Sequence, residues 1–392
     1  MIARTLQPTL LEAARTAPVV AVTGPRQSGK TTLCRATFPD HDYVSLEPLD
    51  HRDFAQSDPR GFLAQHPGPV ILDEVQRAPD LFSYLQEAVD DDPAPGRFIL
   101  TGSEHFGLSE GISQSLAGRV TLLNLLPLSL EELSSAADLP DDPWHVLWAG
   151  GYPRIHDRGL DPARWLADYT ATYVQRDVRQ VLEVTDLTAF STFLRLTAGR
   201  TGQELNLSGL GGDAGVSHNT ARAWLSVLET SFVLFTIPPW LRNLRKRAIK
   251  APKLHLVDSG LACHLLGIRE PEQLATHPLR GAVFESWVAS EILKWRLNRG
   301  RPADLFHLRE TRGLEIDLLV EGGRALTPVE VKSGQTVGSD FFRALHGFGE
   351  RMEADAAHRE LRPRLIFGGD ARQRRTPVDV IPWRQLHEVP WD

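Results

Sequence analysis

The chain has 392 residues with a hydrophobic fraction of 42% and a charged fraction of 24%, which are ordinary values for a globular protein of two or three domains. Its formal net charge of −7 argues against a uniformly basic protein that coats DNA, although it allows a local basic patch. We expect no membrane-spanning helix, because no run of about 18 apolar residues is present. The two cysteines, Cys34 and Cys263, are too far apart for a metal-binding motif, and the N-terminus lacks a secretion signal, so we expect a cytoplasmic protein.

The N-terminal third alternates apolar strands with helix-compatible stretches, which is typical of a parallel α/β sheet. From about residue 165 apolar residues recur at helical spacing, and from about residue 282 the pattern becomes helix, strands and helix. We therefore expect an α/β domain at residues 1–140, a helical domain at 141–260 and a second α/β domain at 261–392. The strands expected in the first domain are 19–23, 43–46, 70–73, 98–101 and 120–123.

Residues 24–31 carry the most informative pattern of the chain, G-x-x-x-x-G-K-T. An apolar strand precedes it and a helix-compatible stretch follows it, which is the context that a phosphate-binding loop requires. Glycines let the backbone curl so that its N–H groups point at phosphate oxygens, and the start of the helix adds a positive dipole. We expect Lys30 to reach the β- and γ-phosphates and Thr31 to hold Mg²⁺. The residues expected to contact the nucleotide here are Gly24, Pro25, Arg26, Gln27, Ser28, Gly29, Lys30, Thr31 and Thr32.

An apolar strand that ends in two acids, at residues 70–74, is predicted to supply the rest of this site. Ligands of open parallel sheets bind at the carboxyl ends of the strands. We therefore expect Asp73 beside Mg²⁺, directly or through water, and Glu74 as the residue that orients and deprotonates the attacking water. Without the phosphate loop, the same two acids would be an ordinary solvated strand end.

Further polar residues are weaker candidates for the same site. Either Ser103 or Thr101, at the end of the strand expected at 98–101, is predicted to hydrogen-bond the γ-phosphate or the lytic water. Arg119 is predicted to offer its guanidinium to the γ-phosphate, from its own subunit or from a neighbouring one. A surface salt bridge is the alternative for Arg119, and Arg26 inside the loop is a weaker candidate for the same role.

Residues 1 to about 140 resemble the AAA-type ATPase domain at the front of a large prokaryotic protein family. The resemblance rests on the segments GPRQSGKTTL, VILDEVQ, ILTGS and LAGRVTLLNLLPLSLEEL. Segments at 150–153, 173–178 and 250–261 resemble the second half of the same family, a domain of unknown function called DUF4143. The resemblance implies a P-loop ATPase fold, ATP with Mg²⁺ as the nucleotide, and self-association into an oligomer such as a ring.

Residues 215–225 are typical of the turn and second helix of a helix-turn-helix motif, and apolar strands at 232–237 and 253–257 would form a wing. A basic run at 242–250 separates these strands and can contact phosphates without reading sequence. A packing module with a solvated wing is the alternative. The residues expected to contact nucleic acid are His218, Asn219, Arg222, Arg245, Lys246 and Arg247.

The C-terminal domain carries Glu285 on an expected helix, Asp317 on an expected strand, and the sequence Glu330-Val331-Lys332 on the next strand. Glu330 and Lys332 project from the same face of that strand. Carboxylates can hold Mg²⁺ or Mn²⁺, and a lysine can steer water toward a phosphodiester. The spacing resembles the PD-(D/E)XK nuclease fold, which implies a metal site of Glu285, Asp317 and Glu330 beside Lys332. A degenerate nuclease fold used for binding is the alternative.

Together these patterns predict Mg²⁺-dependent ATP hydrolysis coupled to the binding and remodelling or processing of DNA. One alternative is a nucleotide-gated switch that binds protein partners, with an inactive nuclease fold. Another is a metal-dependent nuclease that ATP regulates. Neither alternative involves a membrane.

Overall fold

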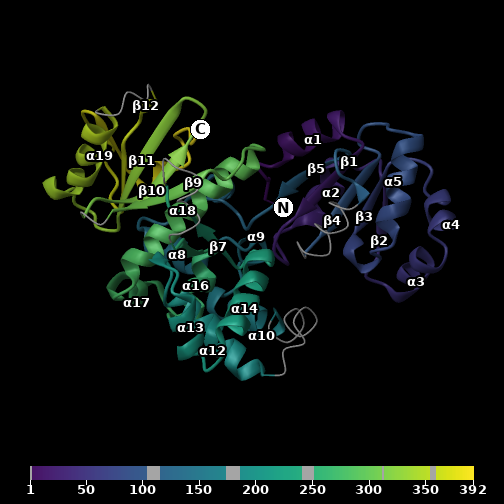
Figure 1. Ribbon diagram of the computed structural model, residues 1–392, viewed down its shortest axis with the longest axis horizontal. Helices are drawn as coiled ribbons and strands as arrows, with labels where there is room; N and C mark the ends of the chain where they lie inside the picture. The colour runs from purple at the N-terminus through teal and green to yellow at the C-terminus, as the bar shows by residue number, and fades with distance from the viewer. Residues whose placement is uncertain (1, 104–114, 174–185, 241–250, 311–312, 354–358) are drawn as a thin grey trace. The chain divides into compact units, whose positions relative to one another are not determined.

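The computed structural model describes residues 2–103, 115–173, 186–240, 251–310, 313–353 and 359–392 (Figure 1). The chain divides into two compact units. The first comprises residues 1–128, 230–232 and 297–301, and the second comprises residues 129–229, 233–296 and 302–392. Within the described ranges, every helix is too short or too polar to cross a membrane.

The first unit is built on a five-stranded parallel sheet with the strand order β2-β3-β4-β1-β5, which confirms the predicted α/β class (Figure 1). β1 is an interior strand that hydrogen-bonds β4 on one side and β5 on the other. All of its five residues are buried, as expected for a strand covered on both faces. The strands are β1 (Val19–Thr23), β2 (Asp42–Ser45), β3 (Val70–Asp73), β4 (Phe98–Gly102) and β5 (Val120–Asn124).

Apolar side chains of this sheet pack into two separate cores because successive residues of a strand point to opposite faces. Val19 and Ala21 belong to a core shared with α3, α4 and α5, whereas Val20 and Val22 belong to a core shared with α1 and α2. The sheet is thus a middle layer between two layers of helices. The helical segments are α1 (Gln7–Thr16), α2 (Lys30–Thr37), α3 (Leu49–Ser57), α4 (Pro59–Ala64), η1 (Val75–Arg77) and α5 (Leu81–Asp91).

The second unit begins with a helical region that contains a small antiparallel sheet of order β6-β8-β7. Phe190 and Phe193 of α12 pack edge-on against Trp224 of α14, with ring centroids 5.2 and 5.4 Å apart. The elements are α7 (Leu130–Ala136), α8 (Pro143–Ala149), α9 (Pro153–Arg158), α10 (Pro162–Tyr173), α12 (Leu187–Ala198), β6 (Gln203–Glu204), α13 (Leu207–Asp213), α14 (His218–Thr230), β7 (Leu234–Ile237), β8 (Lys253–Leu256), α16 (Ser259–Leu265) and α17 (Pro271–Thr276).

The C-terminal part of the second unit is a mixed sheet of order β14-β15-β13-β11-β10-β9, with β12 also paired to β11. β9, β10 and β11 run antiparallel, while β11, β13 and β15 run parallel. Leu345 and Phe348 of α19 pack on one face of this sheet with Ile316 and Leu326. The elements are α18 (Arg280–Asn298), β9 (Leu305–Arg309), β10 (Glu315–Glu321), β11 (Ala325–Lys332), η3 (Ser339–Phe342), α19 (Arg343–Glu353), β12 (Glu360–Leu361), β13 (Arg364–Phe367), β14 (Gln373–Arg375), β15 (Val378–Pro382) and η4 (Trp383–Gln385).

Candidate nucleotide-binding site

The loop between β1 and α2 has a backbone that requires glycine at its first position. Gly24 has a φ of +147°, and a Cβ at this position would lie 2.1 Å from the carbonyl oxygen of Leu125. Gln27 and Gly29 also have positive φ angles, of 62° and 94°. These turns fold the loop back on itself, so that α2 begins at Lys30 directly after the loop. A loop of this kind at a helix start is suited to bind an anion.

The ammonium group of Lys30 lies over this loop. Its Nζ donates hydrogen bonds of 2.9 Å to the carbonyl oxygens of Gly24 and Pro25, and only 5% of the residue is exposed. Burial lowers the pKa of Lys30 to about 8, although the nearby carboxylates of Glu74 and Asp73 partly oppose that shift. The lysine is therefore a buried cation near neutral pH, placed at the loop that is expected to hold phosphates.

Asp73, the last residue of β3, is held by three hydroxyl groups. Thr31 Oγ1 donates to Asp73 Oδ1 over 2.8 Å, and the hydroxyl of Thr101 donates to the same oxygen. Tyr43 donates to Asp73 Oδ2 over 2.9 Å. The structure thus brings together Thr31 and Asp73, the two residues predicted to hold Mg²⁺. A hydroxyl and a carboxylate fit this metal, which takes few protein ligands beside phosphate oxygens and water.

Glu74 follows Asp73 with a positive φ of 59°, which is uncommon for a residue other than glycine. Its carboxylate oxygen Oε2 accepts hydrogen bonds from Gln76 Nε2 over 2.6 Å and from Ser103 Oγ over 3.2 Å. Sparsely populated backbone angles persist where the surroundings enforce them, and such positions cluster at functional sites. Of the two hydroxyl candidates at the end of β4, Thr101 donates to Asp73 and accepts from the N–H of Glu74 over 3.4 Å. Ser103 instead donates to the carboxylate of Glu74.

Arg119 lies at the other end of the sheet. It immediately precedes β5, whereas the phosphate loop follows the C-terminal end of β1, and these two strands are parallel. Its Nε and Nη2 atoms donate to Asp90 over 2.6 and 2.9 Å. The predicted contact of Arg119 with a nucleotide in its own domain is therefore not supported, and the surface salt bridge is what the structure contains. A contact with a neighbouring subunit stays a prediction.

Two residues of this site have no signal in the local sequence pattern. Tyr43 of β2 reaches Asp73, as described above. Arg4, upstream of α1, donates to the carbonyl oxygen of Ser28 over 2.5 Å and to that of Leu126 over 2.7 Å. Arg4 thereby connects the phosphate loop to the segment after β5, and Leu126 of that segment is 122 residues from Arg4 in the sequence. Tertiary packing alone creates these contacts, so the motif itself does not predict them.

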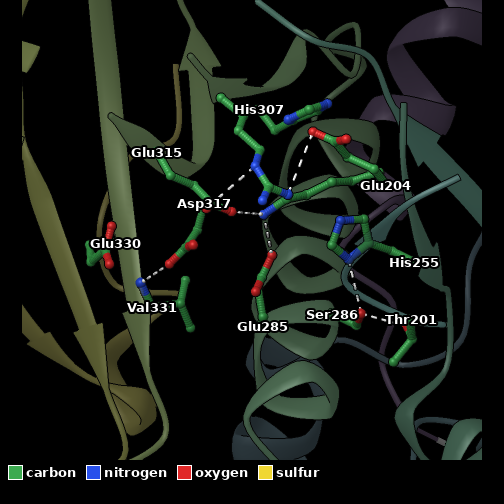
Figure 2. A network of polar contacts seen from close by, with 12 residues as sticks. Thr201, Glu204, His255, Glu285, Ser286, His307, Glu315, Asp317, Glu330 and Val331 are labelled. Atoms are coloured by element: carbon green, nitrogen blue, oxygen red, sulfur yellow. Dashed lines mark hydrogen bonds and ion pairs between the residues drawn. The ribbon is translucent and has the colours of Figure 1, made fainter. Parts of the chain in front are cut away.

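The acids of the C-terminal sheet are arranged differently from the predicted metal site (Figure 2). Glu285 of α18 accepts a hydrogen bond of 3.1 Å from Lys253 Nζ, which also lies 3.5 Å from Glu315. Asp317 Oδ2 accepts from the backbone N–H of Val331 over 2.9 Å. A buried lysine thus pairs with Glu285, although burial and the charge of Asp317 raise the pKa of Glu285 to about 8, and a backbone amide holds Asp317.

Glu330 forms an ion pair with Lys332 on the same strand, as their shared face predicts. Among the described residues, no group of three His, Cys, Asp or Glu side chains is placed to hold a metal ion. The predicted metal site of Glu285, Asp317 and Glu330 is therefore not supported. The physical reason is that Lys253, which the sequence pattern did not include, supplies the positive charge beside Glu285.

A buried hydroxyl–imidazole chain lies near these acids (Figure 2). His255 Nδ1 is 2.9 Å from Ser286 Oγ, which is 2.7 Å from Thr201 Oγ1. Burial lowers the pKa of His255 to about 3, so its ring is neutral at pH 7. Although a serine beside a histidine is also the pair used in nucleophilic catalysis, His255 is fully buried and Ser286 is only 3% exposed. These residues are closed to substrate and stabilise the packing between β8 and α18.

The residues predicted to contact nucleic acid lie in two regions. His218, Asn219 and Arg222 occupy the exposed face of α14, whose other face is buried. Ser217 accepts a hydrogen bond of 3.1 Å from the N–H of Thr220 at the start of this helix, which is a helix-capping contact. The basic residues Arg245, Lys246 and Arg247 lie outside the described residues.

Comparisons with known proteins agree with the architecture. Family models match an AAA domain at residues 16–134, a domain of unknown function (DUF8612) at 141–272 and a domain of unknown function (DUF4143) at 280–386. Uncharacterized protein Rv2008c of Mycobacterium tuberculosis and uncharacterized protein Mb2031c of Mycobacterium bovis are each 34% identical to this chain over 319 residues, which is 80% of this chain and 69% of each relative. The chain belongs to the family of AAA-type ATPases with a C-terminal DUF4143 domain.

Among solved structures, the Walker-type ATPase PABY2304 of Pyrococcus abyssi is similar, with a TM-score of 0.45 and 16% sequence identity. The similarity covers 66% of this chain and 94% of that one. The C-terminal match describes a domain of unknown function, so the resemblance of this region to nucleases stays a prediction.

The family motifs in the middle of the chain have a structural explanation. Asp258 caps α16 by accepting from the N–H of Leu261 over 2.8 Å, and it also accepts from the N–H of Gly151 over 2.7 Å. A Cβ at Gly150 would lie 2.4 Å from Asp258 Oδ1, and one at Gly260 would lie 2.8 Å from the nitrogen of Gly150. These glycines are therefore needed for close approach of two segments.

The motifs at 150–153 and 250–261 lie in the region matched by DUF8612, and the DUF4143 match begins at residue 280. The expectation that these motifs belong to DUF4143 is thus corrected. Of the motif at 173–178, residues 174–178 lie outside the described residues.

Proposed function

We propose that this protein binds ATP with Mg²⁺ and hydrolyses it. The hydrogen bond of 2.8 Å between Thr31 Oγ1 and Asp73 Oδ1 carries the proposal, because it joins the end of the phosphate loop to the acidic end of β3. These are the two protein groups that hold the metal in P-loop ATPases. Mg²⁺ would neutralise charge that develops on the β- and γ-phosphates.

Each neighbouring group has a role in this proposal. The loop amides and the ammonium of Lys30 would bind the phosphate oxygens. Glu74 would orient and deprotonate the attacking water, and Ser103 would hold the Glu74 carboxylate in position through its 3.2 Å hydrogen bond. General bases of this kind commonly contribute about 10²–10⁴-fold to a rate.

The test is to compare ATP turnover by the wild type, Thr31→Val and Thr37→Val, over a titration of Mg²⁺. Thr31→Val keeps the side-chain shape but loses the hydroxyl. We expect its turnover to fall at least about tenfold, with a higher Mg²⁺ requirement. Thr37 lies on the same helix and donates to the carbonyl oxygen of Leu33 instead, so Thr37→Val is the matched control. Equal turnover in Thr31→Val and the wild type would overturn the assignment of the metal site.

Binding of DNA, and its remodelling or processing with ATP hydrolysis, is a second function that the middle region favours. The order α12-β6-α13-α14-β7-β8, with sheet order β6-β8-β7, is the order of a winged-helix domain. In that arrangement α14 would be the recognition helix, and its first turns would contact base edges or phosphates. His218, Asn219 and Arg222 are exposed there. The basic run at 242–250 lies between β7 and β8 in the sequence, where a winged helix has its wing.

This second proposal is tested by fluorescence anisotropy with single-stranded, duplex and branched DNA at two salt concentrations. We expect Arg222→Ala to weaken binding, whereas Arg158→Ala, an exposed arginine of the same region on α9, has no effect. Replacing Arg245, Lys246 and Arg247 together with alanine should also reduce the dependence of binding on salt.

ATP turnover is measured with the same DNA molecules to test the coupling. Binding by no form of DNA, together with unchanged turnover, would reject this function. That result would instead favour the alternative in which ATP controls the binding of a protein partner.

We also propose that the protein self-associates into an oligomer. Its test is light scattering after size-exclusion chromatography, with and without ATP. Arg119→Ala then tests whether Arg119 contacts the nucleotide of a neighbouring subunit. If it does, the variant should lower turnover only under conditions where the protein is an oligomer. If Arg119 serves only in the salt bridge with Asp90, turnover should not depend on assembly in this way.

A further inference from the structure

A cavity of about 470 Å³ lies in the middle region of the second unit, between α10, α12 and the end of α16. This volume is within the range of small-molecule sites, which are about 300–1,000 Å³. All of its lining residues belong to the second unit, and none of them contributes to the nucleotide-binding site. The cavity therefore needs an explanation of its own.

Two arginines at its margin give the cavity a positive charge. Arg195 comes from α12 and Arg269 follows α16. Within the described part of the chain, neither guanidinium has a hydrogen-bond or ion-pair partner. By contrast, Arg200 just after the same helix is paired with Asp213. An arginine fork binds carboxylate or phosphate oxygens with two parallel hydrogen bonds, so two forks without a partner favour an anionic ligand.

A histidine lies close to both arginines. His264 of α16 also lines the cavity, and burial together with the charges of Arg195 and Arg269 lowers its pKa. Its ring is therefore neutral at pH 7 and acts as a hydrogen-bonding group. The positive charge of the cavity comes from the two arginines alone among its lining residues.

Besides the histidine and the two arginines, the lining of the cavity is apolar except for two hydroxyl groups. Leu194 and Leu265 are 2% and 5% exposed and form part of the wall. Ser191 donates to the carbonyl oxygen of Leu187, whereas Thr170 Oγ1 is buried and has no hydrogen-bond partner among the described residues. A buried polar atom without a partner is uncommon in folded proteins, and a ligand oxygen would satisfy it.

We propose that this cavity binds a small molecule that carries an oxyanion, either a carboxylate or a phosphate, on an apolar body. Arg195 and Arg269 bind the oxyanion, Thr170 donates a hydrogen bond, and the leucine wall contacts the body. The site is separate from the phosphate loop, so its occupation does not depend on the ATPase proposal.

The experiment is isothermal titration of the full-length protein with three probes: benzoate, phenyl phosphate and inorganic phosphate. A saturating non-hydrolysable ATP analogue with Mg²⁺ keeps the probes off the phosphate loop, and Lys30→Ala provides an independent check. We expect benzoate or phenyl phosphate to bind with one site per chain. We expect inorganic phosphate to bind more weakly than phenyl phosphate, because it lacks the apolar body.

Variants then locate the binding. Arg195→Gln and Arg269→Gln should each weaken binding by at least about fivefold, since each removes a charged hydrogen-bonding group. Arg158→Gln is the matched control and should bind as the wild type. Two results would overturn the proposal: no saturable binding of benzoate or phenyl phosphate, or unchanged binding in the Arg195→Gln, Arg269→Gln double variant. Circular dichroism melting curves of each variant exclude loss of fold as the cause.

Discussion

Tyr43 donates a hydrogen bond of 2.9 Å to Asp73 Oδ2, while Thr31 donates one of 2.8 Å to Oδ1 of the same carboxylate. Both oxygens of the acid are therefore oriented by hydroxyl groups from neighbouring elements. Burial and the charge of Asp73 raise the pKa of Tyr43 to about 12, so the phenol remains a donor at neutral pH. Tyr43 is thus a positioning residue for the acid proposed to hold the metal.

Tyr43→Phe removes that phenol hydroxyl and little else. We expect turnover of ATP to fall about threefold to tenfold, because Asp73 loses one of the donors that fix its orientation. Affinity for ATP without Mg²⁺ should stay unchanged, since Tyr43 has no expected contact with the phosphates. Steady-state kinetics over a Mg²⁺ titration measures the turnover and the Mg²⁺ requirement, and titration of a fluorescent ATP analogue without Mg²⁺ measures the affinity. A normal turnover and a normal Mg²⁺ requirement would show that Thr31 and Thr101 suffice to hold Asp73.

Glu74→Gln tests the proposed general base. The substitution keeps the shape of the side chain but removes its capacity to take a proton from water. We expect nucleotide binding to remain and turnover to fall by about 10² or more. Binding of a fluorescent ATP analogue and phosphate release measure the two effects separately. Asp91→Asn, at the end of α5, is a control for loss of one acidic charge. Normal phosphate release by Glu74→Gln would assign the base elsewhere.

The lowered pKa of Lys30 predicts a pH dependence of ATP affinity. Burial brings this pKa to about 8, so the ammonium that phosphates require is present at pH 7 and is lost as the pH rises through about 8. Binding above this pH must then take up one proton. The dissociation constant of ATP should therefore be nearly constant below pH 7 and rise by up to about tenfold per pH unit above pH 8.

Lys30→Arg separates this effect from a general loss of binding at high pH. An arginine remains charged at every pH of the experiment, so whatever affinity it retains should vary less between pH 8 and 9. Lys30→Ala should bind no nucleotide at any pH. An ATP affinity of the wild type that stays flat up to pH 9 would contradict the assigned role of burial.

Gly24→Ala should destroy the phosphate loop. The added Cβ would lie 2.1 Å from the Leu125 carbonyl oxygen, and the φ of +147° is strained for any other residue. We expect nucleotide binding to be lost and the free energy of unfolding to fall by about 1–3 kcal/mol. Gly212→Ala in α13 is the matched control, because its Cβ would have no described atom within 4 Å apart from its chain neighbours and the backbone of its own helix. Isothermal titration and urea unfolding distinguish the two variants, and retained ATP binding by Gly24→Ala would contradict the expectation.

Most of the N-terminal domain could be predicted, because short segments of the sequence specify its strands and its phosphate loop. Buried parallel strands are continuous apolar runs, so the strands expected at 19–23 and 70–73 coincide with β1 and β3. The loop pattern likewise specifies its own backbone. Tyr43 and Arg4 were not predictable, since distant segments of the sheet bring them to the loop. Arg119 lies away from the phosphate loop because a residue just before a parallel strand is at the edge of the sheet opposite the ligand.

In the C-terminal site, by contrast, a residue from a distant part of the sequence decides the charge around the acids. The spacing of Asp317, Glu330 and Lys332 identifies residues that share neighbouring strands, and β10 and β11 are indeed paired. However, the charge balance of the site depends on Lys253, which enters from β8, in another part of the sequence. At this site Lys253 Nζ lies 3.1 Å from Glu285 and 3.5 Å from Glu315, so a protein cation already lies beside two of the acids. Which cation is present depends on the tertiary structure.

Lys253 and Glu285 form a largely buried ion pair. Their side chains are 4% and 17% exposed, and Lys253 Nζ lies 3.1 Å from Glu285 Oε1. Burial raises the pKa of Glu285 to about 8, so the test is made at pH 9, where this side chain is ionised. There Lys253→Met should lower the free energy of unfolding by about 3 kcal/mol, because it leaves a buried carboxylate without its cation. Urea unfolding measures this loss. The exposed pair of Arg15 and Glu12, 3.7 Å apart, offers Arg15→Met as a control that should change stability very little.

The double variant Lys253→Met, Glu285→Met distinguishes charge from packing. Two apolar side chains of similar length should recover most of the stability lost in Lys253→Met, because replacing a whole buried ion pair is often neutral. Failure to recover would mean that Lys253 acts mainly through Glu315, 3.5 Å away, or through packing. If Lys253→Met were as stable as the wild type, Lys253 would not be needed to compensate the negative charge of the acids. Those acids would then be free to bind another cation, and that result would favour the hypothesis of a metal-dependent nuclease.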